Sequence, residues 1–328
     1  MDLTAPCLAR PGTISSMNMN LENLNRKYVA RTPHMLEIGA RVTAVEPARG
    51  SMSLPARPEW AGDPVRGLLH PGVLTVLADS ACGLAVGAAL TERAPYATLD
   101  LRMDYLRAAG PGQDLQCDAH CYRITRNVAF VRAEVWQADR DQPIAAAQAS
   151  FMLLTLAGAR KPPQGDAPAQ RASPWAAPAT SDPVRVGSPI PYVEYLGIRA
   201  SSWGGQPLLR LPFQDKMIGN PFLPALHGGV IAGFCETAAL LHLIGSLGGE
   251  KFPKSIDFSV DYLRSGRPEE CFAACEVVRL GSRVALVQVR CWQSSPDNPI
   301  AVARGHFLLT AAEPDAAGLD PASLQTTV

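Results

Sequence analysis

The chain repeats itself, and this internal duplication limits its architecture more than any other feature of the sequence. Residues 62–107 align with residues 219–264 without a gap: GDPVRGLLHPGVLTVLADSA matches GNPFLPALHGGVIAGFCETA, and TLDLRMDYLR matches SIDFSVDYLR. Further along, with the register moved by one residue, Trp136 corresponds to Trp292 and Phe151 to Phe307. Chance similarity between two apolar helices does not produce matches that run through a helix, a loop and several strands. We therefore expect two copies of one domain, which a chain of 328 residues can accommodate.

The repeat also predicts the domain boundaries. We expect an N-terminal domain over residues 20–157 and a C-terminal domain over residues 186–312. The stretch between them, 158–185, is rich in Pro and Ala, which is typical of an extended, semi-rigid linker. Residues 313–328 are expected to form a disordered tail, and the residues before 20 a loose leader.

The composition argues against several classes of partner. Lys and Arg (30) balance Asp and Glu (30), and only 18% of the residues are charged, so the chain has no basic footprint for nucleic acid or an anionic membrane. The eight Cys form neither a CxxC pair nor a Cys/His metal spacing, which favours free thiols and no bound metal. The N-terminus has no apolar run long enough for a signal peptide. We therefore expect a cytoplasmic protein that uses no metal and binds neither nucleic acid nor membrane.

Each copy contains one long apolar segment followed by alternating segments. Residues 71–90 and 228–249 are apolar over about the length of a membrane span, but their Gly content, their single acid and the strands that follow favour a buried helix. In 97–107 and 254–264 apolar and polar residues alternate with a period of two, which indicates strands with one covered face. This alternation places Thr98 on the polar face with Asp100, and Ser255 on the polar face with Asp257. Further strands are expected at 114–124, 127–138, 144–156, 270–280, 283–294 and 300–311.

The fold class that follows is α+β, because a single apolar helix lying against a curled antiparallel sheet is expected in each copy.

Each apolar helix carries a single acid. Asp79 is the only charged residue between His70 and Glu92, and Glu236 is the only Asp, Glu, Lys or Arg between His227 and Glu250. A carboxylate in such a helix is costly to bury unless it is paired or neutral, and burial raises its pKa toward that of a general base. A position that emerges into solvent is the alternative. Because both copies repeat the acid nine residues after a His, we favour a functional role.

The start of each helix adds a second chemical element. Backbone N–H groups at a helix N-terminus favour negative charge, and a Gly there lets a ligand approach closely. An acid together with such an oxyanion site is what acyl transfer requires. The two His residues before the helices more often hydrogen-bond the loop locally, and a catalytic role is the alternative.

These motifs resemble a known family. LLHPGVLTVLADSA and ALHGGVIAGFCETA resemble the HGG-x(6)-[D/E] signature of the PaaI-type (4-hydroxybenzoyl-CoA thioesterase-like) thioesterases of the hotdog-fold superfamily, and the two DYLR strands resemble the strand that follows it. The likeness covers both copies and implies two fused hotdog domains, each an antiparallel sheet wrapped around one long central helix. It also implies hydrolysis of an acyl-CoA thioester to free acid and CoA, with no cofactor beyond the CoA of the substrate. The fused pseudo-dimer is expected to assemble further into a homo-oligomer.

The resemblance assigns roles residue by residue. The acid acts as base or nucleophile, the N–H after the His binds the carbonyl, a polar residue lies ahead of the His, and a hydroxyl comes from the next strand across the interface. In the first copy the N–H position is Pro71, which has no N–H. We therefore expect one competent site made of Glu236, Gly228, Asn220, His227 and Thr98. A second, weaker site is expected from Asp79, Asp63, His70, Gly72 and Ser255.

Other polar residues receive weaker assignments. Arginines at strand ends could meet the phosphates of CoA, and the candidates are Arg107, Arg264, Arg126 and Arg283. The aspartates that alternate along the two DYLR strands are expected to be solvated or paired with a neighbouring Arg.

Two rival functions remain open. The first is a non-catalytic acyl-CoA-binding or scaffold protein of the same double-hotdog architecture, which the loss of the N–H at Pro71 favours. The second is hydration of an enoyl thioester, which ranks lower because the Asp/His pair of hydratases is not recognisable. The identity of the acyl group does not follow from the sequence.

Overall fold

A computed structural model describes residues 21–92, 94–153, 184–185, 190–203, 206–220, 224–248 and 251–311. The expected leader, the expected tail and all of the expected linker except Val184–Arg185 lie outside these ranges.

Both copies place a short helix, two strands and a 3-10 turn before one long helix, and four strands after it. The first contains α1 (Leu21–Leu24), the π-helical turn η1 (Asn25–Val29), α2 (Pro33–Glu37), β1 (Arg41–Glu46), β2 (Arg49–Leu54), the 3-10 turn η2 (Pro58–Trp60), α3 (Pro71–Ala89), β3 (Tyr96–Tyr105), β4 (Leu115–Ile124), β5 (Val128–Trp136) and β6 (Ala145–Leu153). The second contains β7 (Val184–Arg185), α4 (Pro191–Leu196), β8 (Arg199–Trp203), β9 (Gln206–Leu211), the 3-10 turn η4 (Asp215–Met217), β10 (Ile218–Asn220), β11 (Ala225–Leu226), α5 (Gly228–Ser246), β12 (Lys251–Tyr262), β13 (Cys271–Leu280), β14 (Val284–Trp292) and β15 (Ala301–Ala311).

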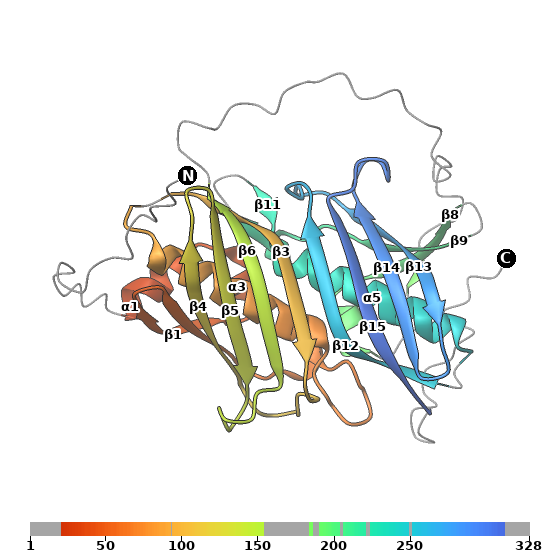
Figure 1. Ribbon diagram of the computed structural model, residues 1–328. Coiled ribbons are helices and arrows are strands. Elements are labelled where there is room, and N and C mark those ends of the chain that lie inside the picture. Colours follow the sequence, from red (N-terminus) through yellow and green to blue (C-terminus); the bar gives the residue numbers. More distant parts are fainter. Residues whose placement is uncertain are drawn as a thin grey trace, which may run out of the picture.

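One continuous antiparallel sheet joins the two copies. Its 13 strands run in the order β1-β2-β4-β5-β6-β3-β12-β15-β14-β13-β9-β8-β7, so the copies meet edge to edge where β3 pairs with β12 (Figure 1). At this seam Asp104 lies opposite Asp257 and Leu101 lies opposite Val260. The α+β class and the pair of fused hotdog domains are thereby confirmed.

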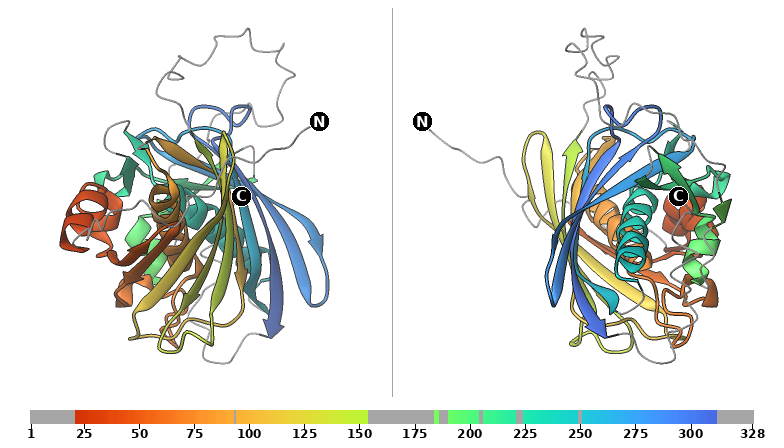
Figure 2. Two further views of the ribbon diagram at one scale, coloured as in Figure 1. Left: turned by 60° about the vertical axis from the view of Figure 1, so that its left-hand side comes forward. Right: turned by 90° about the vertical axis from the view of Figure 1, so that its right-hand side faces the viewer.

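The helices α3 and α5 lie on the same face of this sheet (Figure 2). Both are long and apolar enough to cross a membrane, but 83% of the most apolar stretch of α3 and 78% of that of α5 are buried inside the protein. Their apolar character is therefore explained by the core that they form with the sheet. That core is continuous across both copies.

The two helices approach each other closely through glycines. A Cβ on Gly229 would lie 2.6 Å from the Cα of Val76, and a Cβ on Gly72 would lie 3.0 Å from the Cα of Gly233. Such distances are too short for a side chain, so only Gly allows the backbones to come this close. The start of each helix therefore lies against the first half of the other.

A β-bulge in each DYLR strand corrects one expectation from the sequence. The register of β3 against β6 shifts between Thr98 and Asp100, and that of β12 against β15 shifts between Ser255 and Asp257. The extra residue in a bulge changes which face the residues before it occupy. The prediction that Thr98 and Ser255 share the outer face with the aspartates is therefore wrong, and both hydroxyls bond the helix acids instead.

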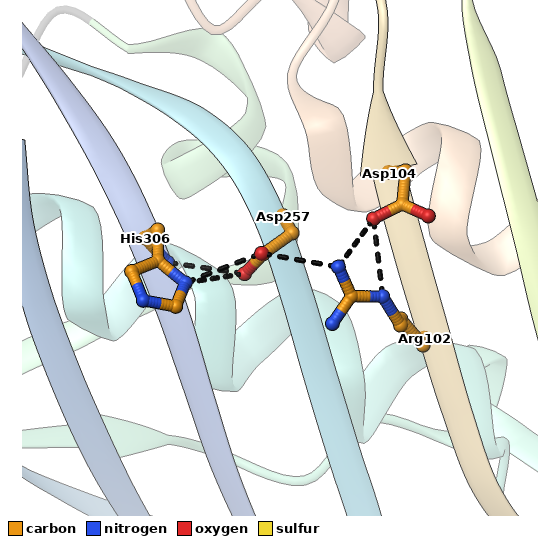
Figure 3. Close-up of polar contacts among 4 residues, drawn as sticks. All are labelled: Arg102, Asp104, Asp257 and His306. Carbon is orange, nitrogen blue, oxygen red and sulfur yellow. Dashed lines mark hydrogen bonds and ion pairs between the residues drawn. The ribbon is translucent and has the colours of Figure 1, made fainter.

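The outer face of the seam carries an ion-pair network (Figure 3). The guanidinium of Arg102 on β3 donates to Asp104 (2.7 Å) and, across the seam, to Asp257 on β12 (3.2 Å). Nδ1 of His306 on β15 lies 3.0 Å from the same Asp257 carboxylate. The expected pairing of these aspartates with a neighbouring Arg is thus confirmed for Asp104 and Asp257. Because the Arg102 side chain is 41% exposed, the network stabilises the seam by no more than about 1 kcal/mol per pair.

The helix crossing leads to a stability prediction. Replacing Gly229 with Ala forces a methyl group against the backbone of α3, and overpacking of this kind costs about 1–3 kcal/mol. The matched control is Gly110→Ala, whose new Cβ would meet its nearest neighbour at an ordinary 3.7 Å. Urea unfolding of both variants measures the difference, and equal midpoints would show that the helices can move apart freely.

Candidate active site

Each core helix begins at a histidine that caps it. Nδ1 of His70 accepts the N–H of Gly72, and Nδ1 of His227 accepts the N–H of Gly229, both at 3.0 Å. Burial lowers the pKa of His70 to about 3, and burial also lowers the pKa of His227 although the nearby Asp79 opposes this. Both rings are therefore neutral near pH 7 with Nδ1 unprotonated. The local hydrogen-bonding role expected for these histidines is present in the structure.

The carboxylate of Asp79 lies at the start of the opposite helix, α5. Its Oδ2 accepts the N–H of Gly229 at 2.9 Å, and its Oδ1 accepts the hydroxyl of Thr98 at 3.0 Å. A Cβ on Gly228 would lie 3.0 Å from Oδ2, so the carboxylate rests directly on this glycine. The Asp79 residue is only 7% exposed. We call this group of residues the Asp79 end.

The carboxylate of Glu236 lies at the other end of the helix pair, on the side where α3 begins. Its Oε2 accepts the hydroxyl of Tyr105 (2.7 Å) and its Oε1 accepts the hydroxyl of Ser255 (2.8 Å). The Tyr105 oxygen is also 2.9 Å from Oγ1 of Thr75, whose hydroxyl in turn donates to the carbonyl of Pro71 (3.3 Å). Glu236 is completely buried, and this burial raises its pKa to about 7 although hydrogen bonds from the surrounding hydroxyls lower it. We call this group the Glu236 end.

The expected grouping of the site residues is therefore corrected. Thr98 bonds Asp79 of its own copy, not Glu236, and Ser255 bonds Glu236, not Asp79. The start of α5 (His227, Gly228) lies beside Asp79, and the start of α3 lies beside Glu236. The physical reason is the length of a helix. An acid nine residues after its own His is about 13 Å further along the axis, at about 1.5 Å per residue, so it cannot reach the N–H groups of its own helix.

Two further candidates lie ahead of the histidines. Asp63 accepts the N–H groups of Val65 and Arg66 and pairs with the Arg66 side chain at 2.7 Å. Partial burial by itself would raise the pKa of Asp63, but these contacts outweigh it and lower the pKa. Asp63 thus holds its own loop in place. Asn220 is exposed at the end of β10, and Gly72 bonds His70 as described.

The two ends differ in their backbone donors. At the Asp79 end the residue after the His is Gly228, whose carbonyl accepts the hydroxyl of Tyr262 at 2.8 Å. At the Glu236 end it is Pro71, which has no N–H. Tyr105, which corresponds to Tyr262 in the repeat, bonds the acid instead of the helix start.

Several contributing residues were not found from the sequence. Tyr105 lies among the apolar residues of the alternation in 97–107, and a Tyr on a covered face needs a partner for its hydroxyl, so that requirement could have singled it out. Thr75, a polar residue one turn ahead of Asp79 in an apolar helix, carried a similar signal. Gly229 belongs to the Gly pair at the helix start but is not among the expected site residues, although its N–H donates to Asp79.

Among the proposed CoA-contacting arginines, Arg107 lines the cavity at the Glu236 end. Arg126, Arg264 and Arg283 are exposed and lie outside that lining. Within the described part of the chain no group of three or more His, Cys, Asp or Glu is arranged to hold a metal ion.

Comparison with known proteins agrees with this geometry. The model of the thioesterase superfamily matches twice, at residues 66–144 and 223–300, once around each acid. The chain thus contains two stretches that are similar to the thioesterase superfamily and together cover a little under half of its length.

Individual curated relatives match parts of this chain. The medium/long-chain acyl-CoA thioesterase YigI of Escherichia coli K12 is 36% identical over 89 residues, which cover 23% of this chain and 57% of the relative, so the match spans little more than half of that protein. YigI of Salmonella typhimurium is 28% identical over 146 residues, covering 40% of this chain and 93% of the relative.

Solved structures support the double-domain fold. A thioesterase candidate from Novosphingobium aromaticivorans superposes with a TM-score of 0.60 at 17% identity, covering 82% of this chain and 98% of that one. The tesB protein of Mycobacterium avium subs paratuberculosis gives 0.59 at 14% identity, covering 82% and 95%. At these identities the likeness concerns the fold alone, and it covers both domains of this chain.

The raised pKa of Glu236 leads to a prediction about stability. The folded protein binds a proton at Glu236 more tightly than the unfolded chain does, because the pKa rises from 4.5 to about 7. This contribution to stability is fully present below pH 4.5 and is lost as the pH rises through 7. Glu236→Gln mimics the protonated acid, so between pH 4.5 and pH 8 the wild type should lose about 3 kcal/mol of unfolding free energy relative to this variant.

The measurement is chemical denaturation of both proteins across that pH range. The control is Glu59→Gln, which changes a carboxylate whose side chain is 44% exposed and should follow the wild type. A constant difference between Glu236→Gln and the wild type at all pH values would contradict a raised pKa.

Proposed function

We propose that the chain is an acyl-CoA thioesterase that hydrolyses its substrate at the Asp79 end. The two matches to the thioesterase superfamily support this activity, and the names of the relatives favour medium- and long-chain acyl-CoAs as substrates. The single observation that carries the proposal is the position of the Asp79 carboxylate, which rests on Gly228 and bonds the N–H of Gly229 at the start of α5. The Asp79 carboxylate and the N-terminus of α5 thus lie next to each other.

The chemistry follows from that position. The thioester carbonyl oxygen accepts the N–H of Gly228, which belongs to the first turn of α5 and has no partner within the helix. Charge that develops on this oxygen is stabilised by the N–H and by the positive end of the helix dipole. Asp79 accepts a proton from a water molecule while the water oxygen attacks the carbonyl carbon. The carbon–sulfur bond then breaks, and CoA leaves as a thiolate that takes the proton back from Asp79.

Two neighbouring groups assist Asp79. The hydroxyl of Thr98 holds Oδ1 and so fixes the orientation of the carboxylate. His227 keeps Gly229 in place through its unprotonated Nδ1, which lies 3.5 Å from Oδ2 of Asp79. Direct attack by Asp79 on the carbonyl carbon, with a mixed anhydride that water then hydrolyses, uses the same geometry and is the alternative route.

The remaining expectations belong to this proposal. They are the domain boundaries drawn from the sequence, a cytoplasmic location, the absence of a cofactor beyond the CoA of the substrate, and assembly into a homo-oligomer. A scaffold role is the second candidate function, and the missing N–H at Pro71 favours it for the Glu236 end alone.

The first test compares the two acids. Asp79→Asn removes the proton acceptor and should lower kcat by about 10²–10⁴-fold, the usual contribution of a general base. Glu236→Gln is the matched control, because it is the same kind of change at the repeated position, and it should keep most of the activity. Release of free thiol from short, long and aryl acyl-CoAs measures both. Equal losses, or a larger loss from Glu236→Gln, would contradict the assignment.

The second test exchanges the residues after the histidines. Gly228→Ala brings a Cβ to 3.0 Å from Asp79 Oδ2 but keeps the N–H, so it is the control. Gly228→Pro also removes the N–H and should lower kcat by about 10²–10³-fold relative to Gly228→Ala, since proline is acceptable at the first position of a helix. The reciprocal variant Pro71→Gly restores an N–H at the Glu236 end. Combined with Asp79→Asn, it should not restore hydrolysis, because Glu236 stays buried beneath the hydroxyls of Tyr105 and Ser255. Unchanged kcat in Gly228→Pro would show that this N–H does not bind the carbonyl.

A further inference from the structure

A cavity of about 340 Å³ opens at the Glu236 end. Its walls are largely apolar and come from both copies, and they include Leu240, Leu241 and Ile244 of α5 and Leu74 of α3. The size is within the range of small-molecule binding sites, and so is the mixture of apolar walls with a few polar groups. Ser255, which bonds Glu236, and Pro71, at the start of α3, also line the cavity.

Basic side chains surround this apolar space. Arg66, Arg107 and Lys254 all belong to the lining. Arg66 pairs with Asp63, and Arg107 bonds the side chain of Gln142. Cationic groups beside an apolar cavity fit a ligand that has an apolar chain at one end and phosphates at the other.

The internal repeat shows how the Asp79 end differs. Leu240 and Ile244 correspond to Gly83 and Gly87 of α3. The space over these glycines is taken by tyrosines, since a Cβ on Gly83 would lie 3.1 Å from the hydroxyl of Tyr28 and a Cβ on Gly87 would lie 3.0 Å from that of Tyr96. The Tyr28 hydroxyl is held by the carbonyl of Ser80 at 2.9 Å. The two ends thus differ at these repeated positions: Leu240 and Ile244 line an open cavity over α5, whereas tyrosine hydroxyls lie beside Gly83 and Gly87 of α3.

The acid beside the cavity is closed off from it. Both oxygens of Glu236 accept hydroxyl groups, and the residue has no exposed surface. Tyr105, which covers one oxygen, is itself fixed by Thr75, and the second copy has Ala232 at the position of Thr75 and so lacks this hydroxyl. Asp79 also has both oxygens bonded, but it keeps 7% of its surface exposed, whereas Glu236 exposes none. Because Pro71 in addition offers no N–H, the cavity lacks an accessible base and a carbonyl donor after the His.

We propose that this cavity is a second acyl-CoA site that binds the thioester without hydrolysing it, with the acyl chain between Leu74 and Leu240 and the CoA phosphates near Arg107 and Lys254. The inference rests on the proposed function, because it takes the substrate class of the Asp79 end as the ligand. One chain then binds two acyl-CoA molecules and hydrolyses one of them.

The experiment counts ligands per chain. The probe is S-octyl-CoA, a thioether without a carbonyl that cannot be hydrolysed, and isothermal titration calorimetry gives its stoichiometry on the full chain. Wild type should bind two equivalents. Leu240→Trp fills the cavity and should bind one equivalent. It should still hydrolyse octanoyl-CoA, whereas Asp79→Asn should lose that hydrolysis. The control Leu280→Trp alters an exposed leucine (54%) on β13 and should bind two.

Each other outcome has a distinct meaning. One equivalent on the wild type, or two on Leu240→Trp, overturns the second site while the thioesterase proposal stands. Loss of hydrolysis in Leu240→Trp together with its survival in Asp79→Asn also overturns the inference, because the cavity would then be catalytic. If the wild type hydrolyses no acyl-CoA but binds two equivalents, the proposed function fails and the cavity remains a binding site.

A second variant guards against misfolding. Ile244→Trp fills the same cavity from the next turn of α5 and should give the same stoichiometry as Leu240→Trp. Circular dichroism identifies a variant that is unfolded. If both variants fold and both still bind two equivalents, the inference is overturned.

Discussion

The close contact between α3 and α5 determines the chemistry at both ends of this molecule. Gly229 packs on the backbone of Val76 and Gly72 packs on Gly233, so the start of each helix lies against the other helix. At the start of α5 this brings the N–H of Gly229 within hydrogen-bond range of Asp79, in the middle of α3. A side chain at either glycine would separate the helices and move Asp79 away from the start of α5. The site is thus a property of the pair of domains, and neither domain alone contains both the acid and the backbone donor.

Much of the architecture could be predicted from the sequence, because it follows from the repeat and from local patterns of apolar and polar residues. The repeat implied two domains, the alternation in the DYLR strands implied a sheet with one covered face, and isolated Asp79 and Glu236 marked the positions where a buried charge needs a partner. The grouping of these acids with the helix starts was predicted incorrectly. The rise of an α-helix already shows that an acid nine residues downstream lies too far from the N-terminus of its own helix. Which helix start the acid contacts depends on how the two helices cross, and the sequence of one helix alone does not determine that crossing.

The bulges illustrate a second limit. An alternating pattern specifies faces only while the register is unbroken, and the extra residue at Leu99 or Ile256 leaves no mark in the alternation. Without the bulge Thr98 would point to solvent and Asp79 would lose its hydroxyl partner. Such a feature arises from pairing with a neighbouring strand, here β6 or β15, so it appears only once the tertiary fold is known.

The covalent joining of the two domains has a consequence for how this molecule can change. In an assembly of two identical subunits every substitution appears at both symmetry-related positions, so an alteration that harms one catalytic centre harms the other. Here each domain has its own residue at every repeated position, as in the pairs Pro71 and Gly228, Thr75 and Ala232, and Gly83 and Leu240. One half can change toward a new ligand while the other half keeps its own site, and the two helices stay packed against each other.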